Sequence, residues 1–297
     1  MTKSHISVCI CTYKRSHFLS PLIKSVDSQA TEDLFTFDII VVDNDWQRTA
    51  QKIVSLCKRE CKTKITYAVE ERQNISLARN KAIQYAKGDL IAFIDDDEIP
   101  DKFWLVTLYK AMGKYKADAV MGPVLPIYQV KPPEWVIKGK FFQRPTYKTG
   151  FINDWTKGRT GNLLIKKSLF DYTGINFDPR FGKGGEDQDL ARRMMRSGFK
   201  FVWCNEAIAH EIIPPARWRL KNMIRKAFTR GKMSAQYPGS RFIMASKSII
   251  AASVYALSLP FLLILDYALF IEYLVKISDH SGRIIAIILK SRIQENE

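Results

Sequence analysis

The first 120 residues alternate between short apolar runs and stretches in which apolar residues recur every three or four positions. Apolar runs of strand length occupy positions 6–10, 38–43, 65–69 and 90–94, and helical spacing occupies 19–26, 53–57, 77–86 and 101–115. Short continuous apolar runs are typical of buried strands, and helical spacing is typical of amphipathic helices. Their alternation predicts an α/β fold, with a mostly parallel sheet flanked by helices.

The pattern is less regular between residues 120 and 213. Segments rich in proline and aromatic residues indicate loops, and TGNLLI at 160–165 predicts a strand entered through a polar turn. The glycine-rich stretch GKGG at 182–185 predicts a mobile loop, followed by a helix that ends at Gly198 and a strand over 199–204. We therefore assign residues 1–213 to one domain.

Composition changes after Pro214 and Pro215. Nine basic residues and no acidic residue lie between Arg217 and Lys247, and positions 248–265 carry no charge. That uncharged stretch approaches the ~20 apolar residues that cross a bilayer. Residues 214–297 are thus predicted to form a basic, apolar tail that associates with the membrane. Pro260 and three serines leave open whether the tail spans the bilayer or lies on it.

The net charge and the cysteines suggest where the protein acts. A formal charge of +16 calls for an acidic partner, such as a phosphorylated ligand, nucleic acid or anionic lipid. Five cysteines without regular spacing do not suggest a disulfide framework, which favours a reducing compartment. The N-terminus has no signal-peptide pattern. Because basic residues that flank an apolar segment tend to stay in the cytoplasm, we expect the protein to lie at the cytoplasmic face of the cell membrane.

Polar clusters follow three of the predicted strands, at 12–15, 43–45 and 95–97. The carboxyl ends of parallel strands are where α/β sheets bind ligands. The third cluster is Asp95, Asp96 and Asp97, whose charges repel unless they are splayed into water or surround a cation. Carboxylates suit Mg²⁺ or Mn²⁺, which could neutralise a departing diphosphate.

Five other residues have both a structural and a functional interpretation. Asp43 could bind a base or ribose, or simply order a turn. Arg79, near the start of its helix, could clamp phosphate or lie on the surface. Glu186 and Asp187 open a helix, where they could cap it or provide a general base. His210 could be a metal ligand or a hydrogen-bonded histidine.

Six segments in order, SVCICTYKR, VVDND, NISLARNKAI, FIDDDEIP, TGNLLI and GKGGEDQDL, cover roughly the first 210 residues. Together they resemble the inverting nucleotide-sugar glycosyltransferases of family 2, whose two-subdomain fold is called GT-A. NISLARN and the glycine-rich loop are particularly similar to bacterial exopolysaccharide glucosyltransferases of the succinoglycan type.

The resemblance implies a role for each matching residue. The nucleotide sugar, usually carrying uridine, would be bound by Thr12, Tyr13, Arg15, Asp43, Arg79, Asp95 and Asp96. Asp97 would be the main ligand of Mg²⁺ or Mn²⁺. His210 stays a further candidate ligand on the ground of its position alone. Asp187 would be the catalytic base, and Glu186 would lie beside it.

The chain departs from the processive members of this family. Those carry Gln-x-x-Arg-Trp near the active site, whereas here Pro214 stands at the glutamine position before Arg217 and Trp218. This difference favours transfer of one sugar. The resemblance as a whole implies a UDP-linked donor, an acceptor hydroxyl, and a role in the assembly of a cell-surface polysaccharide or glycolipid. The expected partners are a nucleotide sugar, a glycan or lipid-linked glycan, and membrane lipids, but no nucleic acid.

Two alternatives remain at this stage. A metal-dependent nucleotidyltransferase shares the α/β design and the metal carboxylates, but it would release pyrophosphate rather than nucleoside diphosphate. A non-enzymatic module that binds polyanions would explain the positive charge, but not the acidic residues at successive strand ends.

Overall fold

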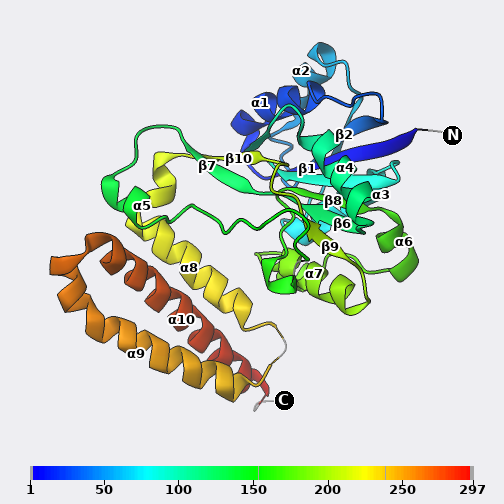
Figure 1. Cartoon of the computed structure of the whole chain (residues 1–297). Helices are drawn as coiled ribbons and strands as arrows, with labels where there is room; N and C mark the ends of the chain where they lie inside the picture. The colour runs from blue at the N-terminus through cyan, green and yellow to red at the C-terminus, as the bar shows by residue number, and fades with distance from the viewer. Residues whose placement is uncertain (1–2, 153, 238, 295–297) are drawn as a thin grey trace. The chain divides into compact units, whose positions relative to one another are not determined.

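The computed structural model describes residues 3–152, 154–237 and 239–294 (Figure 1). It divides into two compact units. The first unit comprises Met1–Ile127, Arg144–Gly182 and Glu186–Ile212, and the second comprises Tyr128–Gln143, Lys183–Gly185 and Ile213–Glu297. The second unit therefore contains the predicted tail together with two segments from the irregular middle of the chain.

A seven-stranded sheet organises the first unit, in the order β3-β2-β1-β4-β8-β6-β9. Its strands are β1 (Ser4–Thr12), β2 (Phe35–Asp43), β3 (Ile65–Val69), β4 (Leu90–Asp95), β6 (Ala119–Met121), β8 (Leu163–Lys166) and β9 (Phe201–Trp203). Strands β1 to β4 are parallel, while β8 runs antiparallel to both β4 and β6. The predicted mostly parallel α/β fold is confirmed.

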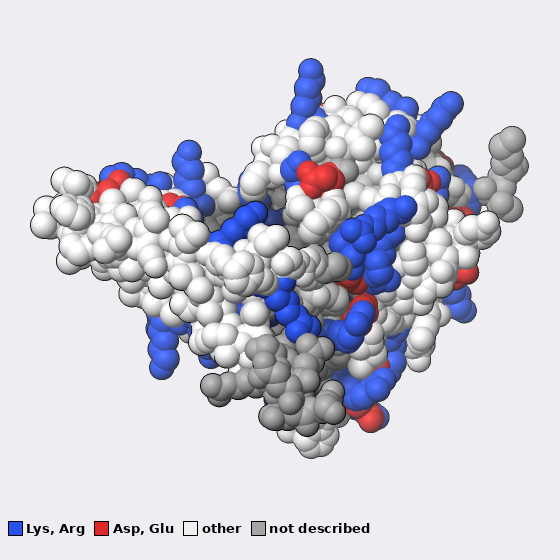
Figure 2. Space-filling model, turned by 90° about the horizontal axis from the view of Figure 1, so that it is seen from below, with Lys and Arg blue, Asp and Glu red and all other residues white. Residues whose placement is uncertain are grey.

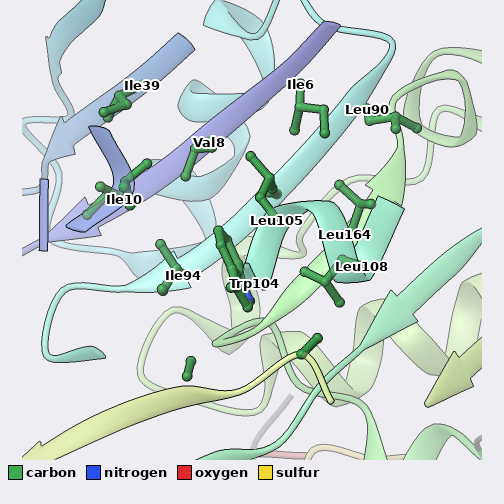
Figure 3. Close-up of a cluster of buried hydrophobic side chains, with 14 of the residues drawn as sticks. Ile6, Val8, Ile10, Ile39, Leu90, Ile94, Trp104, Leu105, Leu108 and Leu164 are labelled. Carbon is green, nitrogen blue, oxygen red and sulfur yellow. The ribbon is translucent and has the colours of Figure 1, made fainter. Parts of the chain in front are cut away.

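Helices cover both faces of this sheet. They are α1 (Ser16–Asp27), α2 (Gln51–Glu60), α3 (Ile75–Tyr85), α4 (Trp104–Tyr115), α6 (Ser168–Thr173) and α7 (Glu186–Arg196). On one face, Ile6, Val8 and Ile10 of β1 pack with residues of α1, α2 and α4, including Trp104 (Figure 3). Strands buried on both faces need nearly continuous apolar runs, which explains the sequence pattern.

The opposite face of the sheet carries α3, α6 and α7. Cys9 of β1 and Ile40 of β2 pack there with Ala78 and Ala82 of α3 and Met194 of α7. The small alanine side chains of α3 allow this helix to lie close to the strands. Helix α3 and the start of α7 are thereby fixed beside the carboxyl ends of β1 and β4.

A three-stranded sheet has the order β5-β10-β7, made of β5 (Glu98–Pro100), β10 (Ala209–Ile213) and β7 (Val124–Tyr128). Strands β5 and β10 are antiparallel, so Glu211 lies opposite Glu98. Short 3₁₀ helices occupy Trp155–Lys157 (η1), Pro179–Phe181 (η2) and Pro215–Trp218 (η3). All five cysteines are free thiols, in agreement with the predicted absence of a disulfide framework.

The second unit is helical, with α5 (Glu134–Lys138), α8 (Leu220–Ser234), α9 (Arg241–Leu265) and α10 (Tyr267–Gln294). Two glycines let α8 and α10 pack closely. A Cβ on Gly231 would lie 1.8 Å from the Asp279 carbonyl oxygen, and one on Gly282 would lie 2.2 Å from that of Phe228. Arg230 Nε also donates to Asp279 Oδ1 at 2.7 Å, which ties the same two helices together.

Helix α9 contains the uncharged stretch 248–265. Among the described residues, it is the one helix that is long and apolar enough to cross a membrane. Its exposed side chains include Leu257, Phe261 and Ile264, and Figure 2 shows uncharged surface in white. Residues 267–277 and 284–289, two further apolar stretches of the tail, both lie in α10. Asp266 caps the first turn of this helix by accepting from the N–H groups of Ala268 and Leu269.

Candidate active site

The carboxyl ends of β1 and β4 meet, as the strand pattern predicts. Thr12 Oγ1, at the end of β1, donates to Asp96 Oδ2 at 2.7 Å. Arg15 Nη1 lies 3.1 Å from both Asp96 Oδ1 and Asp97 Oδ2. Tyr13 is half-buried in the same loop. Four of the predicted nucleotide and metal residues are thus in direct contact.

The three consecutive aspartates are separated by their partners. Asp95 bonds to Arg79, Asp96 to Thr12 and Arg15, and Asp97 to Arg15. Burial raises the pKa of Asp96 to about 6, although the charge of Arg15 opposes this shift. Arginines therefore account for part of the positive charge that the sequence requires here.

The donor set at this edge fits a hard divalent cation. Within the described ranges, no group of three or more His, Cys, Asp or Glu side chains is arranged to hold a metal ion. Mg²⁺, however, is usually bound through one or two carboxylates plus substrate phosphates and water. The carboxylates of Asp95 and Asp97 provide such oxygen ligands at a strand end.

Arg79 links the donor side of the site to α7. Asn74 caps α3 by accepting hydrogen bonds from Ser76 N and Leu77 N, and Arg79 follows in the first turns. The Arg79 side chain is buried, where Nη1 donates to Glu186 Oε1 and Nη2 lies 3.2 Å from Asp95 Oδ1. The interpretation as a surface arginine is wrong, and contact with diphosphate stays a prediction.

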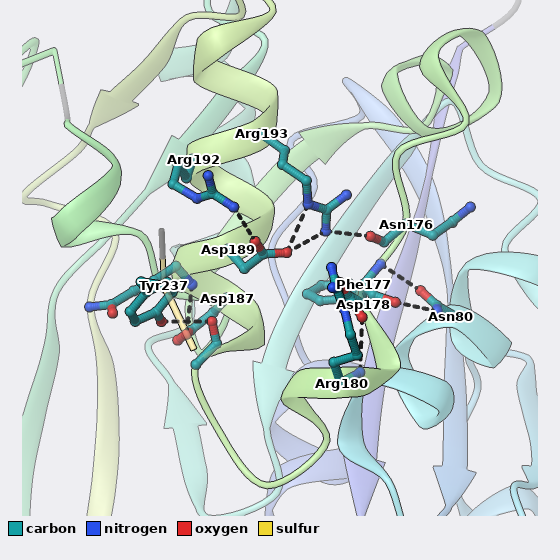
Figure 4. Close-up of polar contacts among 12 residues, drawn as sticks. Asn80, Asn176, Phe177, Asp178, Arg180, Asp187, Asp189, Arg192, Arg193 and Tyr237 are labelled. Carbon is teal, nitrogen blue, oxygen red and sulfur yellow. Dashed lines mark hydrogen bonds and ion pairs between the residues drawn. The ribbon is translucent and has the colours of Figure 1, made fainter. Parts of the chain in front are cut away.

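The first turn of α7 carries three carboxylates with different surroundings. Glu186 pairs with Arg79, while Asp189 accepts from Arg192 Nη2 and Arg193 Nε, both at 2.8 Å (Figure 4). Within the described ranges, Asp187 forms no ion pair, and its Oδ1 accepts from Gln188 N at 2.8 Å. Asp187 is therefore the carboxylate of this turn that is available to a ligand.

The electrostatic environment of Asp187 makes it a stronger base than an aspartate in water. Burial raises its pKa, and this effect outweighs the opposing charges of Arg79 and Arg159. A general base works best when its pKa approaches the operating pH.

Asp43 and His210 have local partners. Asp43 is fully buried, and its Oδ2 accepts from Ala50 N at 2.7 Å and from the Tyr67 hydroxyl at 2.9 Å. His210 Nε2 lies 3.0 Å from Asp101 Oδ1. The geometry agrees with the structural interpretation of each residue, an ordered turn and a hydrogen-bonded histidine. Nucleoside contact by Asp43 and metal binding by His210 stay predictions.

Two charged residues beside the site, the buried Glu98 and the half-buried Arg144, were not identified from the sequence. Glu98 is fully buried, its Oε2 accepts from Asp95 N at 3.2 Å, and its Oε1 lies 4.0 Å from Arg144 Nη1. Arg144 Nη2 also donates to Glu211 Oε2 at 2.9 Å. Glu98 directly follows the three aspartates, which was the available signal. Arg144 lies in an irregular segment without periodicity.

Residues 7–173 match the family described as Glycosyl transferase family 2. Because this match covers more than half of the chain, the chain belongs to the family. It is 32% identical over 238 residues to the succinoglycan biosynthesis protein ExoM of Rhizobium meliloti, covering 78% of this chain and 76% of that protein. The resemblance drawn from the sequence motifs is confirmed.

Further similarities are more distant. The chain is 24% identical over 216 residues to glycosyltransferase GlyA of Streptococcus pneumoniae, covering 68% of this chain and 30% of that longer protein. Its fold is similar to that of residues 1–349 of S. aureus TarS in complex with UDP, with a TM-score of 0.54 and 14% identity over 98% of this chain and 92% of that one. At 14% identity, the similarity to TarS concerns the fold alone.

Proposed function

We propose that this family 2 glycosyltransferase moves a single sugar, with inversion, from a UDP-linked donor to an acceptor hydroxyl in the assembly of a cell-surface polysaccharide or glycolipid. The observation that carries the proposal is the first turn of α7, where Glu186 and Asp189 are held by arginines and Asp187 is not. The succinoglycan role in ExoM's name and the UDP bound by TarS support the product class and the donor.

On the donor side, Thr12, Arg15 and the carboxylates at the end of β4 would surround the nucleotide. When Mg²⁺ or Mn²⁺ is bound through Asp97, it supplies positive charge against the departing diphosphate. Arg15 lies beside Asp97 and adds a second positive charge at the same point. These charges favour breakage of the bond between the sugar carbon and the diphosphate oxygen.

On the acceptor side, Asp187 would accept the proton of the attacking hydroxyl. The hydroxyl oxygen forms a bond to the anomeric carbon as the diphosphate oxygen leaves from the opposite side, so the configuration inverts. The proton ends on Asp187 and UDP is released. The buried contact between Arg79 and Glu186 fixes the start of α7 and thereby the position of its neighbour Asp187.

Product analysis tests this function. Incubation of the full chain with a panel of nucleotide sugars and Mn²⁺ is expected to release nucleoside diphosphate from UDP-linked donors, with water as the acceptor if no other is present. Nucleotidyl transfer would instead consume UTP and a sugar phosphate and release pyrophosphate. Pyrophosphate as the product, without UDP, would contradict the proposal and favour the alternative enzyme.

We also propose that the second unit holds the enzyme at the cytoplasmic face of the membrane. The apolar helix α9 and the nine basic residues between Arg217 and Lys247 support this location. Each basic residue near an anionic surface contributes roughly 1 kcal/mol of attraction, and the apolar side chains add a contribution that salt does not screen.

Vesicle sedimentation tests the membrane proposal. The full chain is expected to sediment with vesicles that contain anionic lipid and to stay with them in high salt, because burial of apolar surface is insensitive to salt. The double substitution Leu257→Glu and Phe261→Glu on the exposed side of α9 should shift much of the protein to the supernatant. Complete release of the unsubstituted protein by salt would rule out an apolar anchor.

A further inference from the structure

A cavity of about 280 Å³ lies within the first unit. Its walls include Arg144, Tyr147, Thr156, Arg159, Gly161 and Trp203. Pockets for drug-sized ligands measure roughly 300–1,000 Å³, so this cavity suits one sugar-sized group. The rings of Tyr147 and Trp203, which meet edge to face at 5.1 Å, provide apolar surface for such a ring.

The cavity borders the catalytic groups on two sides. A Cβ on Gly161 would lie 2.8 Å from Asp95 Oδ2 and 2.6 Å from Glu98 Oε1, so this wall directly contacts the β4 carboxylate. On the other side, Gln188 Nε2 donates to the Thr156 carbonyl oxygen at 3.0 Å, which joins the η1 wall to the residue after Asp187. The cavity thus lies next to the carboxylates of both β4 and α7, where an acceptor is expected to bind.

The cavity also gathers two arginines. Arg144 is paired with Glu211, whereas Arg159 forms no ion pair with any side chain that the structure describes. Partial desolvation and the repulsion by Arg144 lower the pKa of Arg159, although the charges of Asp187 and Glu211 oppose this shift. Lys157, a third cation at the same wall, is already paired with Asp154. Glu211 already neutralises Arg144, whereas Arg159 feels the Asp187 carboxylate only without direct contact, so an anion bound at Arg159 would gain a charge-assisted contact that no described side chain makes.

We propose that this cavity is the acceptor subsite and that the acceptor carries a phosphate or a carboxylate, which Arg159 binds next to the attacking hydroxyl. The inference rests on the proposed function, because it places the acceptor hydroxyl beside Asp187. A phosphate would come from a sugar phosphate, as at the reducing end of a lipid-linked glycan, and a carboxylate from an acidic sugar. The rings of Tyr147 and Trp203 then contact the sugar, and the Arg159 guanidinium favours an acceptor that carries a negative charge.

Calorimetry with the full chain tests the inference, with the donor site first saturated by UDP and Mg²⁺ so that added anions cannot occupy it. The probes are glucose 1-phosphate, glucuronate and glucose. We expect at least one of the two anions to bind more tightly than glucose, and the one that binds identifies the anion source. Loss of one charge-assisted contact in Arg159→Gln should weaken that binding by about 10- to 100-fold.

The matched control is Arg59→Gln, which removes an exposed arginine on α2 and should leave anion binding unchanged. Arg159→Lys keeps the positive charge and should restore part of the affinity. Equal binding of glucose and both anions, or full anion binding by Arg159→Gln, would overturn the inference. The initial UDP titration is a separate readout: failure to bind UDP counts against the proposed donor and not against the charge of the acceptor.

Discussion

Replacement of Asp187 by asparagine is expected to reduce sugar transfer by about 10²- to 10⁴-fold, the usual contribution of a general base. Asparagine has nearly the same shape but cannot accept the hydroxyl proton. Binding of UDP should be almost unchanged, because the described contacts of Asp187 lie within α7. Transfer measured as UDP release, together with calorimetry of UDP binding, tests both expectations on the same sample.

The pH dependence gives an independent test of the same residue. The base must be ionised to accept a proton, so transfer should fall as pH falls through the pKa of Asp187. Because burial raises this pKa, the fall should begin above the ~3.9 of an unperturbed aspartate. The contribution of Asp187 to the acid limb should disappear in Asp187→Asn, where only groups such as Asp96, with a pKa of about 6, still titrate. The limb should be unchanged in Asp171→Asn, which alters an exposed aspartate on α6. Normal transfer by the variant would remove Asp187 as the base, and lost UDP binding would place it in the donor site.

Asp97→Asn is expected to lower turnover by at least about 100-fold, because Lewis-acid stabilisation of the leaving group contributes several kcal/mol. The substitution removes a charged oxygen ligand while it keeps the shape of the side chain. Mn²⁺ binding in the presence of UDP, followed by electron paramagnetic resonance, should weaken in parallel with UDP release.

Asp97 is buried and lies 3.1 Å from Arg15, so thermal unfolding must accompany this experiment. A variant that melts close to the unsubstituted protein and still loses Mn²⁺ supports the metal assignment. Near-normal turnover at saturating Mn²⁺ would refute it. Asp101→Asn, which alters only the partner of His210, tests the second candidate ligand. Intact turnover in this variant would indicate that Asp97, and not His210, holds the metal, whereas a loss of turnover and of Mn²⁺ would indicate that His210 is also a ligand.

The main features of the fold could be predicted because its central strands are buried on both faces. Residues 6–10 of β1 and 38–43 of β2 are buried, and helical periodicity separates the two strands, which is the pattern of a parallel sheet. The direction of β8 could not be predicted, since a four-residue strand with three apolar residues and a lysine carries no information on orientation. Segment 128–143 also lacks periodicity, and its place in the second unit depends on contacts distant in sequence.

The site was predictable where it follows from topology. Strand ends converge in a parallel sheet, which brought Thr12, Asp96 and Asp97 together as expected. Arg79 and Glu186 are 107 residues apart, and nothing local to either one indicates the partner. The roles of Arg144 and Arg159 depend on an irregular segment folding over the sheet, where spacing along the chain gives no guide to position.

Strand β4, which ends at Asp95, pairs on its outer side with a strand that the ribosome reaches only at Leu163. A chain synthesised from its N-terminus at about 5–20 residues per second therefore leaves this edge open for several seconds. Unpaired edges are the places where one nascent chain can pair with another. Premature termination between β4 and β8 would release a fragment in which β3, β2, β1 and β4 can pair while the outer edge of β4 stays open to another chain. This risk of aggregation follows from the order of the strands.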